Sequence, residues 1–257
     1  MKKKLILLFS TLLFTAFLAA CGSDDNESEA SGGDKDVLKM GTSADFPPYE
    51  SRNPQGEFEG FDIELGKLIA EELGMELEIE DMKFEGLIGS LQANRVDMVI
   101  SGMNASEDRK KNVDFSNVYN DTGQMFVTKD KAMESLDELD GKTLGVQLGS
   151  IQENGADALA EEYNIEVKKV DDAGILAQEL NANRIDAVYL SKEVALGYMD
   201  SQGFFGFDDP NSSTEGMAIA FPKDSDLVDD VNAVLEKLEE DGTLKSLKEE
   251  WIPGSVE

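Results

Sequence analysis

Residues Asp97 to Arg109 read DMVISGMNASEDR, and this stretch decides the fold that we expect for the chain. It opens on three apolar residues, as a buried parallel strand does, and then changes into small polar residues. Ligands of open α/β sheets bind at the carboxyl ends of such strands. Gly102 lets a ligand approach the backbone, and the planar guanidinium of Arg109 matches a carboxylate with two hydrogen bonds. The stretch therefore predicts a small-anion anchor; the alternative is an exposed arginine that opens a surface helix.

The unit around this strand occurs a second time along the chain. Residues 93–97 read ANRVD and residues 182–186 read ANRID, 89 positions later. In both places a helical pattern precedes the motif and a short apolar run comes after it. A helix–turn–strand unit used twice predicts two similar α/β lobes with a cleft between them, which is a default ligand site. The arginine and aspartate of each copy are expected to stabilise the turn rather than to contact a ligand.

Two connecting segments divide the chain between the predicted lobes. The polar residues at 119–123 indicate one crossing, and a return crossing is expected near 212–216. The first lobe then comprises residues 37–120 together with 215–257, and the second comprises residues 121–214. The predicted fold class is a two-lobed α/β architecture with two hinge crossings and the ligand in the cleft between the lobes.

A helix start in the second lobe offers another half of the site. Ser150 and Glu153 have the spacing of a capping box, directly after the predicted strand Thr143 to Gln147. The free N–H groups and the positive end of the helix dipole at such a terminus favour an anion. Farther on, Asp200 to Gly216 contains clusters of Gly, Pro, Asn and Ser, which predict a loop.

Composition excludes several classes of function. The chain has 257 residues, 40% of them hydrophobic, which suffices for a packed core. Its formal net charge of −31 disfavours binding to nucleic acid and to anionic lipid. The absence of histidine excludes histidine-based acid–base catalysis and histidine metal sites, and no metal-ligand spacing or cofactor motif appears. A well-solvated surface explains the charge; adaptation to high salt is the alternative.

The first residues predict export and attachment to a membrane. Three lysines precede the apolar run Leu5 to Leu18, which is too short for a good spanning helix and is typical of a signal peptide over residues 1–20. The sequence LAACG around Cys21 resembles a bacterial lipobox, so Cys21 is the predicted lipidation site. Residues 21–36 predict a lipid anchor and a flexible acidic tether. The resulting protein would be extracytoplasmic and anchored to the cell membrane.

Three stretches together resemble a known family over nearly the whole mature chain. They are residues 41–50 with Gly60-Phe61-Asp62, residues 97–116, and residues 216–251. Their residues are similar to those of the extracytoplasmic solute-binding proteins of polar amino-acid ABC importers. The resemblance implies a type II periplasmic-binding-protein fold that closes on its ligand. It also implies a monomer without cofactor or catalytic residues that delivers a small zwitterion to an ABC permease.

The resemblance also implies roles for individual residues. Phe46 and Phe61 would enclose the ligand side chain, although an aromatic in the Pro-rigid loop around Phe46 could equally fill the core. Arg109 would bind the α-carboxylate. The full set of expected ligand-binding residues is Ser43, Asp45, Phe46, Phe61, Ser101, Gly102, Met103, Asn104, Arg109, Gln147, Gly149, Ser150, Ile151 and Ser191.

The chain departs from the family pattern at three of these positions. Ser43 and Ser191 stand where acids are frequent, and Asn104 replaces a frequent threonine. A buried ammonium without a counter-ion would cost several kcal/mol, so another acid substitutes or the ligand is not an ordinary amino acid. An ectoine-type compatible solute is one alternative ligand. A dehydratase on the same fold and a lipid-anchored sensor are the alternative functions.

Overall fold

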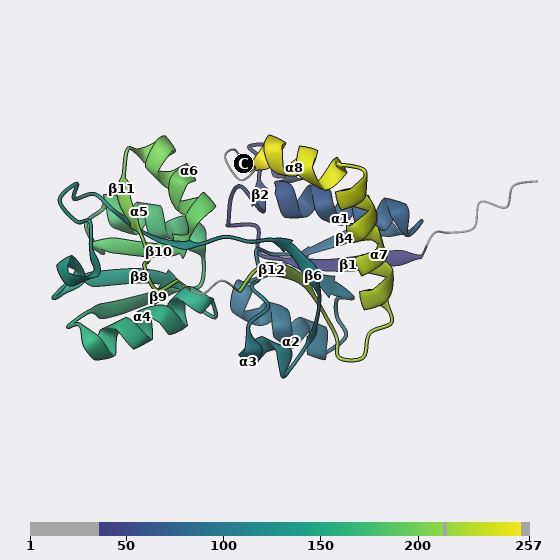
Figure 1. Ribbon diagram of the computed structural model, residues 1–257, viewed down its shortest axis with the longest axis horizontal. Coiled ribbons are helices and arrows are strands. Elements are labelled where there is room, and N and C mark those ends of the chain that lie inside the picture. Colours follow the sequence, from purple (N-terminus) through teal and green to yellow (C-terminus); the bar gives the residue numbers. More distant parts are fainter. Residues whose placement is uncertain (1–35, 213–214, 253–257) are drawn as a thin grey trace, which may run out of the picture. The chain divides into compact units, whose positions relative to one another are not determined.

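The computed structural model describes residues 36–212 and 215–252, and within them the chain forms two five-stranded α/β sheets, each with its own helices (Figure 1). The first sheet has the strand order β4-β1-β5-β12-β6. Its strands are β1 (Val37–Thr42), β4 (Glu76–Asp81), β5 (Met98–Val99), β6 (Asp114–Asn120) and β12 (Met217–Phe221). β1 pairs in parallel with β4 and β5, whereas β12 is antiparallel to β5 and β6.

Helices cover both faces of the first sheet (Figure 1). One face carries α1 (Phe61–Glu72), α7 (Leu227–Glu240) and α8 (Thr243–Trp251), and the other carries α2 (Leu87–Gln92) after the short 3-10 helix η1 (Phe84–Gly86). α3 (Glu107–Lys110) comes after the loop that leaves β5, and the hairpin β2 (Ser51–Arg52) and β3 (Phe58–Glu59) precedes α1. The apolar positions of α1 fall three and four residues apart, so that Phe61, Leu65 and Ile69 are buried on one face.

The second sheet has the strand order β11-β7-β10-β8-β9. Its strands are β7 (Gln124–Thr128), β8 (Thr143–Gln147), β9 (Glu166–Val170), β10 (Ala187–Ser191) and β11 (Phe205–Asp208). Its helices are α4 (Ile151–Glu162), α5 (Leu176–Asn181), α6 (Lys192–Gln202) and the 3-10 helices η2 (Leu136–Leu139) and η3 (Ala173–Ile175). β7 and β10 are buried along their whole length, as their nearly continuous apolar sequences predict.

The chain passes from the first sheet to the second between β6 and β7. Residues 121–123 separate the end of β6 at Asn120 from the start of β7 at Gln124, inside the predicted crossing at 119–123. The chain returns between β11 and β12, where residues 213–214 lie outside the described part. The predicted two-lobed fold class is confirmed by this arrangement and by the structural neighbours described below.

The two copies of the sequence repeat have the same local structure. A 3-10 turn and a short helix, η1 with α2 and η3 with α5, precede β5 and β10. Asn94 and Asn183 have left-handed φ values of 50° and 54°, which asparagine adopts more readily than most residues. Asp97 accepts the N–H of Lys39 at 2.8 Å, and Asp186 accepts that of Thr143 at 2.9 Å. Each aspartate therefore stabilises a neighbouring strand, which agrees with the structural role expected for it.

Two segments differ from the sequence predictions. The strand expected to contain the apolar run from Met98 to Ile100 is assigned only at Met98 and Val99, and the backbone turns away at Gly102, whose φ is +52°. The loop expected from Asp200 to Gly216 contains the end of α6 and the edge strand β11. β11 pairs with β7 along four residues, a long-range contact that the surrounding Gly and Pro residues conceal in the sequence.

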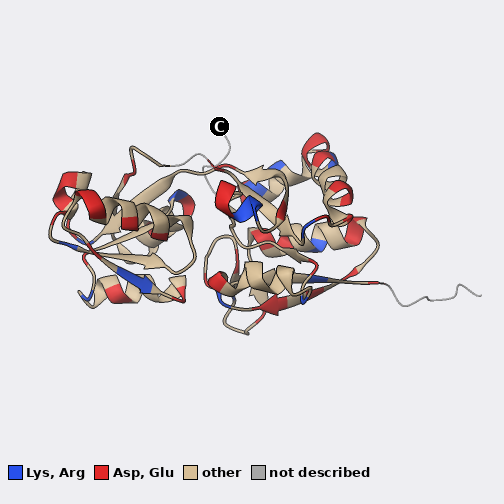
Figure 2. Ribbon diagram, turned by 90° about the horizontal axis from the view of Figure 1, so that it is seen from below, with Lys and Arg blue, Asp and Glu red and all other residues tan. Residues whose placement is uncertain are grey.

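Acidic side chains occur on the helices of both lobes, and basic side chains are fewer (Figure 2). Most ion pairs among the described residues are exposed, such as Lys111 with Asp108 and Lys237 with Glu72. None of the described helices has the length and apolar character needed to cross a membrane. The predicted signal peptide, Cys21 and the tether lie outside the described residues.

Candidate functional site

Arg109 is a buried cation where the two lobes meet. The side chain is 8% exposed and belongs to α3, whose N-cap is Ser106. Its Nη1 donates to the carbonyl of Asn104 at 2.8 Å, and its Nη2 donates across the lobes to the carbonyl of Gly149 at 2.9 Å. Burial lowers the pKa of Arg109 to about 10, an effect that the charge of Glu215 partly offsets. A desolvated guanidinium with carbonyl partners is suited to receive an anionic group.

Gly149 brings the second lobe against the first. Its φ is +79°, and a Cβ atom built on it would lie 3.0 Å from the Cα of Glu85 in the first lobe. The next residue, Ser150, is the N-cap of α4: its Oγ accepts the N–H of Glu153 at 3.1 Å and donates to the carbonyl of Gln147 at 2.7 Å. The N-cap predicted at Ser150 is therefore present, but the capping box is incomplete, because Glu153 accepts the N–H of Gly149 rather than that of Ser150. The Ser150 hydroxyl is thus already engaged in ending β8 and starting α4.

A nearly closed cavity of about 10 Å³ lies between Arg109 and the start of α4. Both lobes line it, and of the described residues that do so only Arg109 is charged. The lining residues are Phe46, Phe84, Ser101, Gly102, Asn104, Arg109, Gln147, Ser150, Ile151, Gln152 and Ser191. Nine of them belong to the set expected from the sequence. Phe84 and Gln152 were not in that set.

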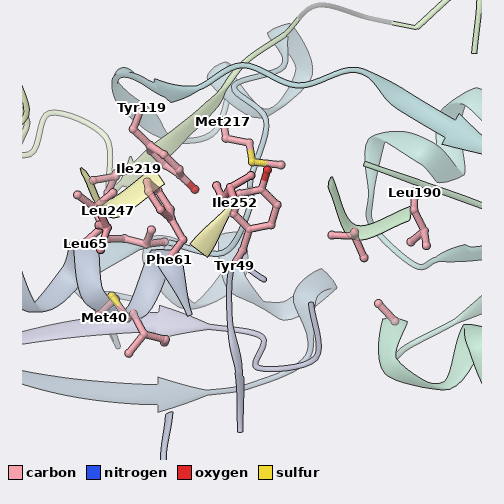
Figure 3. Packing of buried hydrophobic residues seen from close by; sticks show 14 of the residues in the cluster. Met40, Tyr49, Phe61, Leu65, Tyr119, Leu190, Met217, Ile219, Leu247 and Ile252 are labelled. Atoms are coloured by element: carbon pink, nitrogen blue, oxygen red, sulfur yellow. The ribbon is translucent and has the colours of Figure 1, made fainter. Parts of the chain in front are cut away.

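The aromatic residues of the cavity are Phe46 and Phe84. The Arg109 guanidinium lies 5.3 Å from the centre of the Phe84 ring, within the range of a cation–π contact. Phe61 does not line the cavity, which corrects the expectation that it encloses the ligand with Phe46. Its ring is fully buried in the first-lobe core, 5.8 Å from that of Tyr119 and stacked on it (Figure 3). As the first residue of α1, Phe61 points toward the sheet.

Two buried acidic side chains accept hydrogen bonds from the loop that comes after β5. Glu50 accepts the hydroxyl of Ser101 at 2.9 Å, and Asp62 accepts the N–H of Gly102 at 2.6 Å and the hydroxyl of Tyr119 at 2.9 Å. Burial raises the pKa of Asp62 to about 6. Burial, with the neighbouring Asp62 charge, raises that of Glu50 well above its ordinary value. Glu50 Oε2 and Asp62 Oδ1 have no other partner within the described part of the chain, so a proton shared between the carboxyls satisfies both.

Asp45 lies in a contact between the lobes rather than in the cavity. Its carboxylate accepts the N–H of Ala173 at 3.0 Å and the side-chain amide of Gln147 at 3.3 Å. Burial raises its pKa to about 6. Nearby, Lys83 of the first lobe forms an ion pair with Asp172 of the second at 3.0 Å. These contacts link the loop after β1 to the start of η3.

The remaining expected residues do not line the cavity themselves but contact residues that do. Ser43 donates its backbone N–H to Ser101 Oγ at 3.0 Å. Met103 packs in a first-lobe cluster with Phe84, and the Gly149 carbonyl accepts the Arg109 bond described above. Phe84 could have been found from its place in the helix–turn–strand repeat. Gln152 could have been found from its place in the first turn of α4, at the helix end expected to face the ligand.

The second-lobe wall of the cavity consists of amide and hydroxyl groups. Gln152 Nε2 donates to Gln124 Oε1 and, at 3.4 Å, to Ser191 Oγ. All three residues are buried, and Gln124 Nε2 has no hydrogen-bond partner among the described residues. The cavity therefore combines one cationic group on the first lobe, two aromatic rings, and neutral polar groups on the second.

A two-lobed α/β fold with a polar cavity between the lobes defines a solute-binding protein of the type that encloses its ligand. The chain belongs to the family of bacterial extracellular solute-binding proteins, family 3, whose family model matches residues 38–254. This confirms the family resemblance on the full length of the described part.

Individual relatives are named for amino-acid binding. The chain is 43% identical to the arginine-binding extracellular protein ArtP of Bacillus subtilis (strain 168), over 99% of both chains. It is similar to the structure of an ancestral arginine-binding protein bound to arginine, with a TM-score of 0.80, 38% identity, and coverage of 85% of this chain and 99% of that one. It is also similar to an amino acid ABC transporter substrate-binding protein of Streptococcus pneumoniae bound to L-arginine, with a TM-score of 0.78, 31% identity, and coverage of 86% and 96%.

Proposed function

We propose that this protein is the substrate-binding component of an ABC importer and that it captures a polar or charged amino acid, arginine foremost. The observation that carries the proposal is the buried guanidinium of Arg109, which is the only charged group among the described cavity residues. An α-carboxylate would supply the anion that this cation lacks within the cavity.

The remaining cavity walls suit the rest of such a ligand. The rings of Phe46 and Phe84 offer faces on which an aliphatic or guanidinium side chain can pack. The oxygens of the polar second-lobe wall can accept hydrogen bonds from N–H groups. The relatives described above are binding proteins for amino acids, which favours ligand capture over dehydratase chemistry and over an osmolyte ligand.

Binding would proceed through closure of the lobes. We assign residues 37–120 and 215–257 to one lobe and residues 121–214 to the other, with hinges at the two crossings. The ligand would first meet Arg109 and the loop after β5. Closure would then bring Gly149, Ser150 and the start of α4 onto it and exclude water, which strengthens each charge-assisted hydrogen bond. The closed protein would deliver the ligand to a membrane permease as a monomer.

Titration calorimetry tests this function. We expect L-arginine to bind with a Kd on the order of 1 μM, which corresponds to about −8 kcal/mol. Lysine, histidine, glutamine and ectoine should be titrated beside it. Absence of heat with every amino acid, or binding of ectoine alone, would contradict the proposal. Incubation with a prephenate-like substrate should give no turnover.

We further propose that Cys21 is lipidated and anchors the protein outside the cell membrane. The support is the order of a positive segment, an apolar run, small residues and a cysteine in residues 1–22. Detergent phase separation of the protein expressed in a bacterial host tests it. The native chain should enter the detergent phase and Cys21→Ala should remain in the aqueous phase. Equal partition of the two proteins would contradict lipidation.

A further inference from the structure

Three side-chain amides line the cavity, and each has its nitrogen engaged in a protein hydrogen bond. Asn104 Nδ2 donates to the carbonyl of Glu215 at 2.5 Å. Gln147 Nε2 donates to Asp45, and Gln152 Nε2 donates to Gln124 and Ser191. Among the described residues the oxygens of these three amides have no protein partner, and they are not fully enclosed atoms. They are therefore free to accept hydrogen bonds from a ligand in the cavity.

The orientation of these amides has a chemical consequence. A cavity that presents Arg109 and three acceptor oxygens offers one site for an anion and several for N–H donors. No carboxylate occurs among the described lining residues. Since the acceptors are neutral, hydrogen bonds rather than a contact ion pair would recognise the cationic part of the ligand.

The side-chain amide of Gln152 is held by two hydrogen bonds rather than one. Its amide nitrogen has two acceptors, Gln124 Oε1 and Ser191 Oγ, and all three side chains are buried to more than nine-tenths. A rotated amide would place its oxygen against those two acceptors and its N–H groups toward the cavity. In the arrangement of the structure the two bonds occupy the nitrogen of Gln152 and leave its oxygen without a protein partner among the described residues.

We infer that Gln152 is a specificity-determining residue: its amide oxygen, aimed by Gln124 and Ser191, accepts a hydrogen bond from a cationic nitrogen of the bound amino acid. The inference rests on the proposed function and adds to it how the ligand cation is recognised. Neutral acceptors distinguish a cation from an uncharged N–H group less strongly than a carboxylate does. The site should therefore become more selective for charge when a carboxylate replaces this amide.

Gln152→Glu is a variant that the surrounding cluster can accommodate. Gln124 Nε2 is buried without a partner in the described part of the chain, so rotation of the Gln124 amide would let it donate to a carboxylate at position 152. The Ser191 hydroxyl, which now accepts from Gln152, can donate to the same carboxylate. The new charge would then have two protein donors and the ligand cation as partners. Gln202→Glu is the matched control, because Gln202 is exposed at the end of α6 and the substitution adds the same charge.

The experiment compares three ligands by titration calorimetry: L-arginine, L-citrulline, which lacks the side-chain charge, and 5-guanidinopentanoate, which lacks the α-ammonium. Two affinity ratios result, arginine to citrulline and arginine to the desamino compound. In Gln152→Glu at least one ratio should rise by about tenfold or more over the native protein. The ratio that rises identifies the cationic group facing position 152. Gln202→Glu should leave both ratios within about twofold.

An unchanged pair of ratios in a folded Gln152→Glu protein would overturn the inference, as would a rise of the same size in Gln202→Glu. Thermal unfolding establishes that the variant is folded. If Gln152→Glu does not fold, Gln124→Leu provides the second route, because it removes one of the two acceptors of Gln152 Nε2. That variant should narrow at least one of the two affinity ratios, and no change in either ratio would overturn the inference. Failure of the native protein to bind arginine would instead contradict the proposed function.

Discussion

The two copies of the helix–turn–strand unit share a backbone, but the segments that come after them differ. After β5 the chain continues through Ser101 and Gly102 into a loop that ends at the buried Arg109. After β10 the chain enters α6 directly, with Ser191 as its N-cap. Beneath the first loop lie the acids Glu50 and Asp62. The Ser191 hydroxyl instead contacts a neutral amide.

This difference distinguishes residues that serve the fold from residues that belong to the candidate site. The shared geometry of the unit, with its left-handed asparagine and strand-bonding aspartate, serves the fold in both lobes. The candidate ligand contacts are the few residues beyond each strand. The first lobe provides the charged group of Arg109, in a loop that the ionisable side chains of Glu50 and Asp62 stabilise. The second lobe provides neutral groups that do not titrate. Variants placed at matching positions of the two copies can test this separation.

The largest expected effect is on the anchor. Arg109→Ala should weaken arginine binding by at least about 100-fold, because a desolvated charge-assisted bond is lost and the ligand carboxylate remains buried. Arg184→Ala, in the turn of the second copy, is the control and should change the Kd by less than about twofold. Titration calorimetry measures both. An Arg109→Ala protein that is folded and binds within a few-fold of the native one would show that the anchor is misassigned.

The ionisable side chains of Glu50 and Asp62 predict a pH dependence that the second lobe lacks. Glu50 and Asp62 have raised pKa values in the folded protein, so the folded state binds more protons than the unfolded one. Their stabilising contribution is present below the ordinary pKa of a carboxyl group and is lost as the pH rises through the raised pKa values, which is about 6 for Asp62. Glu50→Gln should therefore gain stability relative to the native protein on going from pH 4.5 to pH 7.5, because the amide does not have to lose a proton in a buried position.

Urea unfolding at the two pH values measures this difference. The glutamine amide keeps an oxygen for Ser101 and gains a donor for Asp62, so the variant is a conservative one. A Glu50→Gln protein that is destabilised equally at both pH values would argue against a proton shared between the carboxyls.

The aspartates of the repeat should have similar, smaller effects. Asp97→Ala and Asp186→Ala each remove the acceptor of one strand N–H group and should lower the free energy of unfolding by about 1 kcal/mol. Asp97→Ala should have the larger effect, since its bond is less exposed. Arginine affinity should change little in either variant. A large loss of affinity in only one of them would mean that the copies are not equivalent scaffolds.

The smallest effect should come from the arginines of the turns. Arg184 pairs with Glu179 through an exposed guanidinium, whereas no ion pair of Arg95 occurs among the described residues. Arg184→Ala should lower the melting temperature less than Asp186→Ala does, and Arg95→Ala should not change it measurably. The Arg184→Ala effect should disappear in about 1 M salt. A decrease in melting temperature that persists in high salt would point to packing rather than charge.

Much of the fold could be predicted because local patterns repeat and agree with each other. The repeat at residues 93–97 and 182–186 predicted two lobes, and the capping box at Ser150 predicted the start of α4. β11 was missed since its pairing with β7 is a long-range contact without a local signal. The length of β5 was overestimated because the backbone turns at Gly102, and only the N–H of Ile100 still bonds to β1 beyond Val99.

The site could be predicted less completely than the fold. Arg109 was found because its residue type and its position after a strand agree. The aromatic partner was misplaced, since a sequence does not indicate that the first residue of α1 points into the core while Phe84 of η1 lines the cavity. The orientation of Gln152 depends on Gln124, 28 residues away, and no periodic pattern connects them.

A Cβ atom at position 149 would lie 3.0 Å from the Cα atom of Glu85, so a side chain there would require the two segments to move apart, and the φ of +79° would be strained. A single methyl group there would hinder closure of the two lobes sterically. The part of the cavity that contains Arg109 would stay intact. Such a protein would still bind its ligand weakly, but its lobes would not close around it. Substitution at position 149 is therefore a way to hold this binding protein in an open conformation, in which it would sense the ligand but release it readily.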